Sequence, residues 1–271
     1  MFEDIKRTSE DCLTLCFPGV GSAFAKKNNQ TSLIIAKNGK TILVDAGTTI
    51  PVALHQNGVP FLDFDHYFIT HTHADHIGGL EELLLMSRYT RNGKKVSMII
   101  TDGFQDTLWN KSLRGGVEYS EAKLLRFSDV VEPVRPRWVK ASPREMYEVD
   151  VDGIHLLIFR TKHIPGDAYE WESSYWSTGI VIDNKVMFTA DTKFDPSIFS
   201  DIDPGGLDTI FHDCQLFDPG SVHASYNELK TLPDGLKERM YLTHYGDSFD
   251  KFNPKDDGFK GFAEQWKIYP F

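Results

Sequence analysis

The residues with the clearest chemical potential stand in one short run of histidine and aspartate. His71, His73, Asp75 and His76 fall within six residues, directly after an apolar segment at 65–70. Imidazole and carboxylate groups are ligands that zinc and similar divalent ions prefer. His71 and His73 are two residues apart, so their side chains point the same way in extended backbone. The run therefore predicts a metal site at the end of a strand.

Three further residues of the same types each follow an apolar run in the second half of the chain. They are His163, Asp191 and His244. Each of them alone is typical of a capping or surface residue. Because ligands often gather where several strands end at one edge of a sheet, we expect all three to join the first cluster.

Short apolar runs between turn residues indicate the strands that would position these side chains. Hairpins are predicted around the Asn-Gly, Asp-Gly and Asp-Asn pairs at 38–39, 152–153 and 183–184. Helical patterns cover 77–86, 104–113 and 225–231. Two strand-rich halves with interspersed helices predict sheet layers packed on each other and covered by helices. We interpret residues 1–271 as a single domain.

Composition excludes several classes of protein. The 29 basic and 39 acidic residues give a net charge of −10, which argues against a protein that coats nucleic acid. The three cysteines, Cys12, Cys16 and Cys214, are too few for a disulfide framework and suit a reducing compartment. No signal peptide or membrane-spanning run is evident, so we expect a cytoplasmic protein, in the host cytoplasm if it is phage-encoded.

The order of these residues resembles the metal signature of the metallo-β-lactamase superfamily. The likeness begins at Asp45, in the segment Val-Asp-Ala-Gly, and extends through the run at 71–76 to His244. It implies an α/β fold, the αββα sandwich, with a dinuclear metal centre at one edge. It also implies that Asp45 supports the fold and the ligands without binding metal itself.

The same resemblance implies a ligand set for two divalent ions, most often Zn²⁺, with Mn²⁺ as the other choice. By analogy, the first ion is held by His71, His73 and His163, the second by Asp75, His76 and His244, and Asp191 bridges both. Asp75 is also a candidate catalytic residue. Two ions about 3.5–4 Å apart promote hydrolysis of phosphodiesters, lactones, thioesters or lactams, so the centre alone does not name the substrate.

Three other segments are similar to the ribonuclease Z-like phosphodiesterase branch of this superfamily. They lie at 19–24, 211–216 and 222–225. The resemblance implies that His223 donates a proton to the leaving alkoxide or binds a phosphate oxygen, with Asp213 as the carboxylate that orients an active-site histidine. His212 is a weaker candidate for a supporting residue. Ser225 is a candidate for substrate binding, although it also has the features of a helix N-cap.

The substrate is expected to be small. The short stretch between His163 and Asp191 leaves no room for the arm with which transfer-RNA processing enzymes grip RNA, and its irregular part, 164–172, is acidic and aromatic. The compact length and intact motifs resemble the anti-Pycsar phosphodiesterases of phages and bacteria. That group implies hydrolysis of 3′,5′-cyclic mononucleotides to nucleoside monophosphates, which disarms an antiviral signal.

Members of this branch are commonly homodimers, and residues 114–119 are a candidate loop for reaching a partner's site. Aromatic residues available to stack on a base are Tyr119, Tyr169, Trp171 and Trp176. We take Tyr119 as the candidate substrate contact among them. Ordinary packing is the commoner explanation for each of these aromatic residues, and a solvated helical face is the commoner one for the segment.

Three alternatives remain open. The chain is a transfer-RNA 3′ endonuclease with a reduced arm, a lactone or ester hydrolase, or a metal-bearing protein that binds without turnover. A complete ligand set speaks against the last of these. Activity on carboxylic esters with little dependence on His223 would favour the lactone hydrolase.

Overall fold

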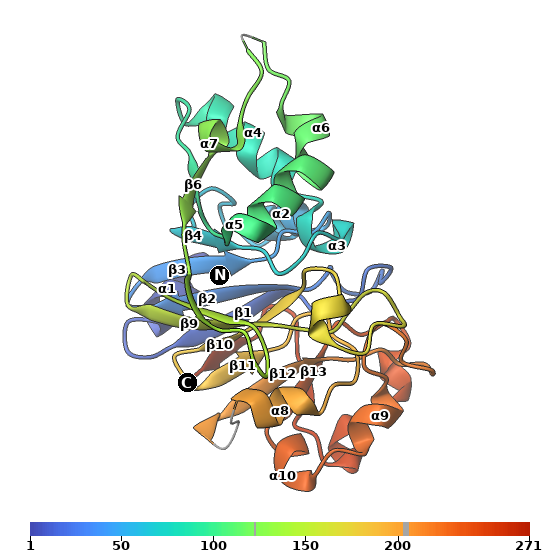
Figure 1. Ribbon diagram of the computed structural model, residues 1–271. Coiled ribbons are helices and arrows are strands. Elements are labelled where there is room, and N and C mark those ends of the chain that lie inside the picture. Colours follow the sequence, from blue (N-terminus) through green and yellow to red (C-terminus); the bar gives the residue numbers. More distant parts are fainter. Residues whose placement is uncertain (122, 203–205) are drawn as a thin grey trace. The chain divides into compact units, whose positions relative to one another are not determined.

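The computed structural model describes residues 1–121, 123–202 and 206–271 of the protein. The chain folds as two compact units. The first unit comprises Met1–Gly19, Gln30–Pro136 and Trp266–Pro270, and the second comprises Val20–Asn29, Arg137–Gln265 and Phe271. Each unit contains one sheet, shown in Figure 1. That residues 1–271 act as a single domain stays a prediction.

The sheet of the first unit has, in the described part of the chain, seven strands in the order β15-β1-β2-β3-β4-β5-β6. Their bounds are β1 Thr14–Gly19, β2 Ser32–Lys37, β3 Lys40–Val44, β4 His66–Phe68, β5 Val96–Ile99, β6 Val131–Val134 and β15 Ile268–Pro270. Strands β3 to β6 are parallel. The carboxyl ends of β3 and β4 therefore lie at the same edge, where the histidine-rich run begins.

The sheet of the second unit has eight strands within the described ranges, in the order β14-β13-β12-β11-β10-β9-β8-β7. Their bounds are β7 Arg137–Lys140, β8 Met146–Val151, β9 Ile154–Arg160, β10 Thr178–Ile182, β11 Val186–Phe188, β12 Thr209–Asp213, β13 Met240–Thr243 and β14 Gly261–Phe262. β9 and β11 are each antiparallel to β10, and β11, β12 and β13 are parallel. The four strands β9, β11, β12 and β13 thus end at one edge.

Helices accompany each sheet. Those of the first unit are α1 Phe2–Thr8, α2 Ile50–Gln56, α3 Ala74–Ile77, α4 Leu80–Thr90, α5 Asp102–Leu108, the π-helix η1 Trp109–Leu113, α6 Arg114–Val117 and α7 Phe127–Val130. Those of the second are η2 Trp171–Ser173, α8 Ser197–Ile202, α9 Tyr226–Lys230, α10 Asp234–Lys237, η4 Phe249–Lys251 and η5 Pro254–Asp257. None of the helices in the described residues is long and apolar enough to span a bilayer.

The core of the second unit lies between its sheet and α8 and α9. Ile198 and Phe199 of α8 and Leu229 of α9 pack with Ile210 of β12 and Leu242 of β13 in one buried cluster. Burying this apolar surface stabilises the sheet whose strand ends carry the candidate ligands.

The predicted hairpins are confirmed. Asn38 and Gly39 have φ of 51° and 73°, and Asp183 and Asn184 have φ of 49° and 55°. Positive φ at both central residues is the geometry of a type I′ turn, which Asn, Asp and Gly tolerate best. The helix predicted over 104–113 is instead α5 followed by the π-helix η1, and residues 114–117 of the candidate loop form α6.

Three strand ends are conformationally strained. Asp45 after β3, Ala190 after β11 and His244 after β13 have φ of 60°, 48° and 59°. Residues other than glycine rarely adopt this left-handed region, and each such residue costs about 1–3 kcal/mol. Such strain concentrates at functional sites, and two of these residues are themselves candidate site residues.

A buried arginine with two carboxylate partners supports the second unit. Arg144 is 1% exposed; its guanidinium donates to Asp195 at 2.7 Å, to Asp201 at 3.0 Å and to the carbonyl of Arg160 at 2.7 Å. Burial by itself raises the pKa of Asp195. The Ser197 hydroxyl and the Arg144 guanidinium more than offset this and hold that pKa below its ordinary value.

Replacing Arg144 with alanine should destabilise the protein by about 3–5 kcal/mol, because it leaves the buried Asp195 carboxylate without its guanidinium partner. Urea unfolding at pH 7 measures this. The stabilisation from the lowered pKa of Asp195 is present above the carboxyl's unfolded pKa and is lost as pH falls through the folded pKa. The deficit of the variant should therefore shrink in acid, and a deficit that grows in acid would contradict the account.

Candidate active site

The histidine-rich run of the first unit forms a compact cluster. His71 lies three residues beyond the end of β4, and His73 is the N-cap of α3, whose first turn carries Asp75 and His76. His71 Nε2 is 3.0 Å from His73 Nδ1, and His76 Nε2 is 3.3 Å from Asp75 Oδ2. His71, Asp75 and His76 are buried. The prediction that the run clusters at a strand end is thus matched within this unit.

Asp45 holds this cluster in place. Its carboxylate accepts hydrogen bonds from the Thr70 amide and hydroxyl, both at 2.8 Å, and from His76 Nδ1 at 2.7 Å. The bond to Nδ1 fixes the tautomer of His76 and makes Nε2 the nitrogen that would bind a metal ion. Burial raises the pKa of Asp45, against the opposing influence of His76 and Thr70. This agrees with the supporting role that the resemblance implied for Asp45.

Close backbone approach explains a glycine here. A Cβ at Gly47 would lie 1.9 Å from the carbonyl oxygen of Asp75, so any larger residue would push α3 away from β3.

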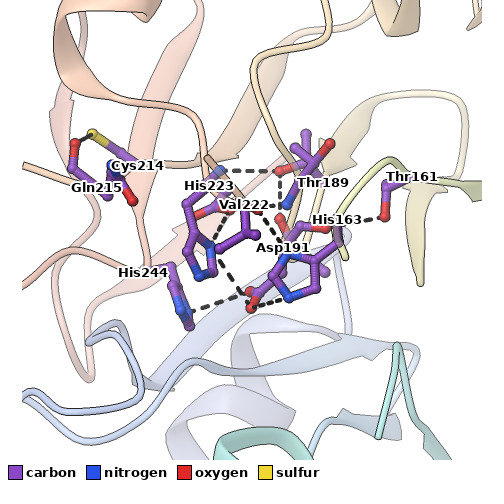
Figure 2. A network of polar contacts seen from close by, with 12 residues as sticks. Thr161, His163, Thr189, Asp191, Cys214, Gln215, Val222, His223 and His244 are labelled. Atoms are coloured by element: carbon purple, nitrogen blue, oxygen red, sulfur yellow. Dashed lines mark hydrogen bonds and ion pairs between the residues drawn. The ribbon is translucent and has the colours of Figure 1, made fainter. Parts of the chain in front are cut away.

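The second unit brings His163, Asp191 and His244 together at the ends of β9, β11 and β13 (Figure 2). Asp191 Oδ1 lies 3.4 Å from His244 Nδ1, and Oδ2 lies 3.8 Å from His163 Nε2. The three residues are at most 2% exposed. The two carboxylate oxygens of Asp191 therefore face different histidines.

His163 is held in its neutral form. Its Nδ1 donates to the carbonyl of Val222 at 2.7 Å, so Nε2 is left without a proton when the ring is neutral. Burial lowers its pKa to about 4, although the charge of Asp191 opposes the shift. At neutral pH this ring can therefore bind a metal ion without first losing a proton.

His223 and Asp213 form a pair beside Asp191. Asp213 ends β12 and is fully buried, and its Oδ2 accepts from His223 Nδ1 at 2.8 Å and from the Thr192 amide at 2.9 Å. The His223 ring is 21% exposed and lines a pocket. A carboxylate that orients an accessible histidine in this way is the arrangement of a general acid or base.

The donor chemistry of the second unit fits a divalent metal. Nitrogen and oxygen ligand atoms of Asp191, Asp213, His223 and His244 lie within 4.8 Å of one another. Asp213 Oδ1 is buried and has no hydrogen-bond partner among the described residues. Two buried carboxylates so close together are costly without a cation, so these residues fit a metal site.

Two other predicted residues take structural positions. The Ser225 hydroxyl caps α9 by accepting from the Glu228 amide at 3.2 Å, and Ser225 is fully buried. This explains the residue as a cap, and its contact with substrate stays a prediction without support from these contacts. His212 is buried, and its Nδ1 donates to the carbonyl of Asp213 at 2.7 Å.

The aromatic candidates differ in their surroundings. Tyr119 belongs to the first unit and is 68% exposed, so its substrate contact also stays a prediction. Tyr169 is exposed as well, whereas Trp171 and Trp176 hold the Arg160 guanidinium 5.5 and 4.7 Å from their ring centres. Two phenylalanines that sequence reasoning missed, Phe24 and Phe217, line the pocket with His223.

Comparison with known proteins decides the family. The family model of the anti-Pycsar protein Apyc1 matches residues 13–269. The chain belongs to this family. Similar relatives include the anti-Pycsar protein Apyc1 of Paenibacillus harenae, 37% identical over 86% of this chain and 90% of the relative. Another is the anti-Pycsar protein Apyc1 of Bacillus phage vB_BsuM-Goe3, which is 35% identical over 94% of this chain and 97% of the relative.

Solved structures identify the fold. The metallo-β-lactamase fold protein YhfI from Bacillus subtilis aligns with a TM-score of 0.67 and 14% identity over 96% of this chain and 99% of that protein. The predicted metallo-β-lactamase fold is therefore confirmed. With this fold, the family and the buried histidine–aspartate clusters, the chain is a metal-dependent hydrolase.

Proposed function

We propose that the protein hydrolyses 3′,5′-cyclic mononucleotides to nucleoside monophosphates at a centre for two divalent ions. The observation that carries the proposal is the Asp191 carboxylate, whose oxygens face His244 and His163 separately. A carboxylate bridge between two ions needs this arrangement. Membership in the anti-Pycsar family supports a cyclic-nucleotide substrate and an action against antiviral signalling.

The ligand set of this proposal is the one that the resemblance implies. His71, His73 and His163 would hold the first ion, Asp75, His76 and His244 would hold the second, and Asp191 would serve both. Zn²⁺ suits these ligands best, and Mn²⁺ is the alternative. When bound, the ions would lower the pKa of a water molecule and neutralise charge that develops on the phosphate. Asp75 would serve the reaction as one of the ligands of the second ion.

His223 completes the reaction as the general acid. Hydrolysis adds one water and breaks the bond between phosphorus and one ester oxygen of the ring. That oxygen leaves as an alkoxide and takes a proton from His223 Nε2. Asp213 keeps Nδ1 protonated through its 2.8 Å hydrogen bond and stabilises the charged ring before transfer.

Protein purified without chelator should contain about two equivalents of divalent metal per chain, because the proposed ligand set serves two ions. Elemental analysis by plasma mass spectrometry measures this. Asp191→Ala protein, analysed alongside, should hold less metal. A metal-free protein with full hydrolytic activity would contradict the proposal.

A substrate panel tests the function itself. We expect metal-loaded protein to hydrolyse 3′,5′-cyclic mononucleotides and to leave a precursor transfer RNA and a carboxylic lactone unchanged. Cleavage of the RNA with inert cyclic nucleotides would favour the endonuclease alternative. Turnover of the lactone alone would favour the ester hydrolase.

The proposal also includes a homodimer acting in the cytoplasm, which is the host cytoplasm if the protein is phage-encoded. Tyr119, exposed at 68%, is the candidate residue for contacting substrate from the segment that follows α6. Light scattering of the purified protein measures the oligomeric state, and a monomer at assay concentrations would remove the dimer from the proposal.

A further inference from the structure

A pocket of the second unit joins the His223 and His244 rings to two exposed phenylalanines. Phe24 and Phe217 line it together with these histidines, and its volume is about 330 Å³. This is at the lower end of the range for small-molecule sites, about 300–1,000 Å³. The described residues that line it include no Asp, Glu, Lys or Arg. The pocket thus extends from the candidate catalytic histidine over an uncharged, partly aromatic surface.

Phe24 projects from a tight turn. The Ala25 amide donates to the Ser22 carbonyl at 3.1 Å, which places Phe24 within the turn, and Phe24 is 88% exposed. The turn is fastened at both sides: the Ser22 amide donates to the Tyr245 carbonyl at 3.1 Å, and the Lys26 amide donates to the Asp247 carboxylate at 2.9 Å. Tyr245 follows His244 directly, so the Phe24 turn is tied to the segment that carries this candidate ligand.

Phe217 is presented by a second fastened loop. It is 71% exposed, but its carbonyl and that of Pro219 both accept from Gln215 Nε2 at 2.7 Å. A Cβ at Gly220 would lie 2.1 Å from a carboxylate oxygen of Glu228, so the loop is closely packed where it turns towards His223.

Exposed aromatic rings on fastened loops are suited to stacking. The apolar ring faces lose water when a flat ligand covers them, and little backbone freedom is lost because the loops are already held. The uncharged lining favours a neutral ring system over a phosphate, which belongs at the metal ligands. In a substrate cleaved beside His223, the neutral planar part is the nucleobase.

We propose that Phe24 and Phe217 form the nucleobase site, binding the base by stacking while the cyclic phosphate lies at the metal ligands and His223. This inference rests on the proposed function, because it identifies where part of that substrate binds. Base–aromatic stacking contributes to the free energy of binding, and alanine substitution of one ring measures that contribution.

The test compares two substrates of the metal-loaded protein: adenosine 3′,5′-cyclic phosphate and an abasic ribose 3′,5′-cyclic phosphate, which has the same phosphodiester without a base. For Phe24→Ala we expect kcat/KM on the nucleotide to fall about 10-fold, mainly through KM, with no change on the abasic substrate. Phe217→Ala should behave alike, and Phe24→Trp should restore the nucleotide value. Calorimetry with a hydrolysis-resistant cyclic phosphorothioate should show the same loss of affinity.

Trp138→Ala is the matched control, because Trp138 is 56% exposed on β7 and does not line the pocket. Equal losses on both substrates, or no loss on either, in Phe24→Ala and Phe217→Ala would overturn the base site while leaving the phosphodiesterase proposal intact. If the unaltered protein hydrolyses neither substrate, the proposed function fails, and the base site fails with it.

Discussion

Asp191→Ala is expected to reduce hydrolysis of cyclic nucleotides by roughly 10³-fold or more, because it removes the carboxylate proposed to bridge two ions. Without this carboxylate, the separation of the ions would no longer be fixed, and less negative charge would offset their mutual repulsion. The fold should survive, since Asp191 is not part of the hydrophobic core of the second unit. Steady-state kinetics with saturating metal measures the loss.

Asp234→Ala is the control for this substitution, because the Asp234 side chain is 86% exposed and far along the chain in α10. Its activity should match the unaltered protein. Circular dichroism should show both variants folded. Folded Asp191→Ala protein with full metal content and unreduced turnover would show that the bridging role is misassigned.

His223→Ala should lower the rate on a cyclic nucleotide by about 10²–10⁴-fold while both metal ions stay bound, because the leaving alkoxide needs a proton. On a phosphodiester with a nitrophenolate leaving group, which departs without protonation, the loss should be much smaller. Parallel kinetics on the two substrates, with metal content determined for each preparation, measure the difference.

The pattern of losses separates the possible roles of His223. Equal losses on both substrates would indicate that the ring binds phosphate and does not donate a proton. No loss on either would return His223 to a surface position before α9 and remove the general acid from the proposal. Asp213→Asn, which keeps the shape but not the charge at the 2.8 Å contact with His223 Nδ1, should reduce the rate on the nucleotide selectively as well.

Local signals predicted those parts of the fold that local geometry determines. The pair Asn38 and Gly39 marks its hairpin because both residues tolerate positive φ. The C-terminal strand β15, at Ile268–Pro270, escaped prediction because it is short and exists through pairing with β1 at the other end of the chain. The π-helix at Trp109–Leu113 carries the same apolar spacing as an α-helix over so few residues, so the pattern could not distinguish them.

The candidate site, too, was predictable where the sequence signal is local and not where it depends on the folded structure. The density of His71, His73, Asp75 and His76 in one run is a local signal, and their clustering within the first unit follows from it. The base site was not foreseen, because a lone Phe24 looks like a core residue until the turn that exposes it is known. Conversely, Trp176 seemed free to stack on a base, but it packs on the Arg160 guanidinium.

The most direct test of the central claim is the rate of 3′,5′-cyclic mononucleotide hydrolysis while metal-free protein is titrated with Zn²⁺ or Mn²⁺. The account predicts that activity appears with metal and rises until about two equivalents per chain are bound, with a nucleoside monophosphate as the product. Phosphorus NMR identifies the product, and equilibrium dialysis counts the ions. Undiminished hydrolysis in excess chelator, or no hydrolysis at any metal loading of the folded protein, would contradict it.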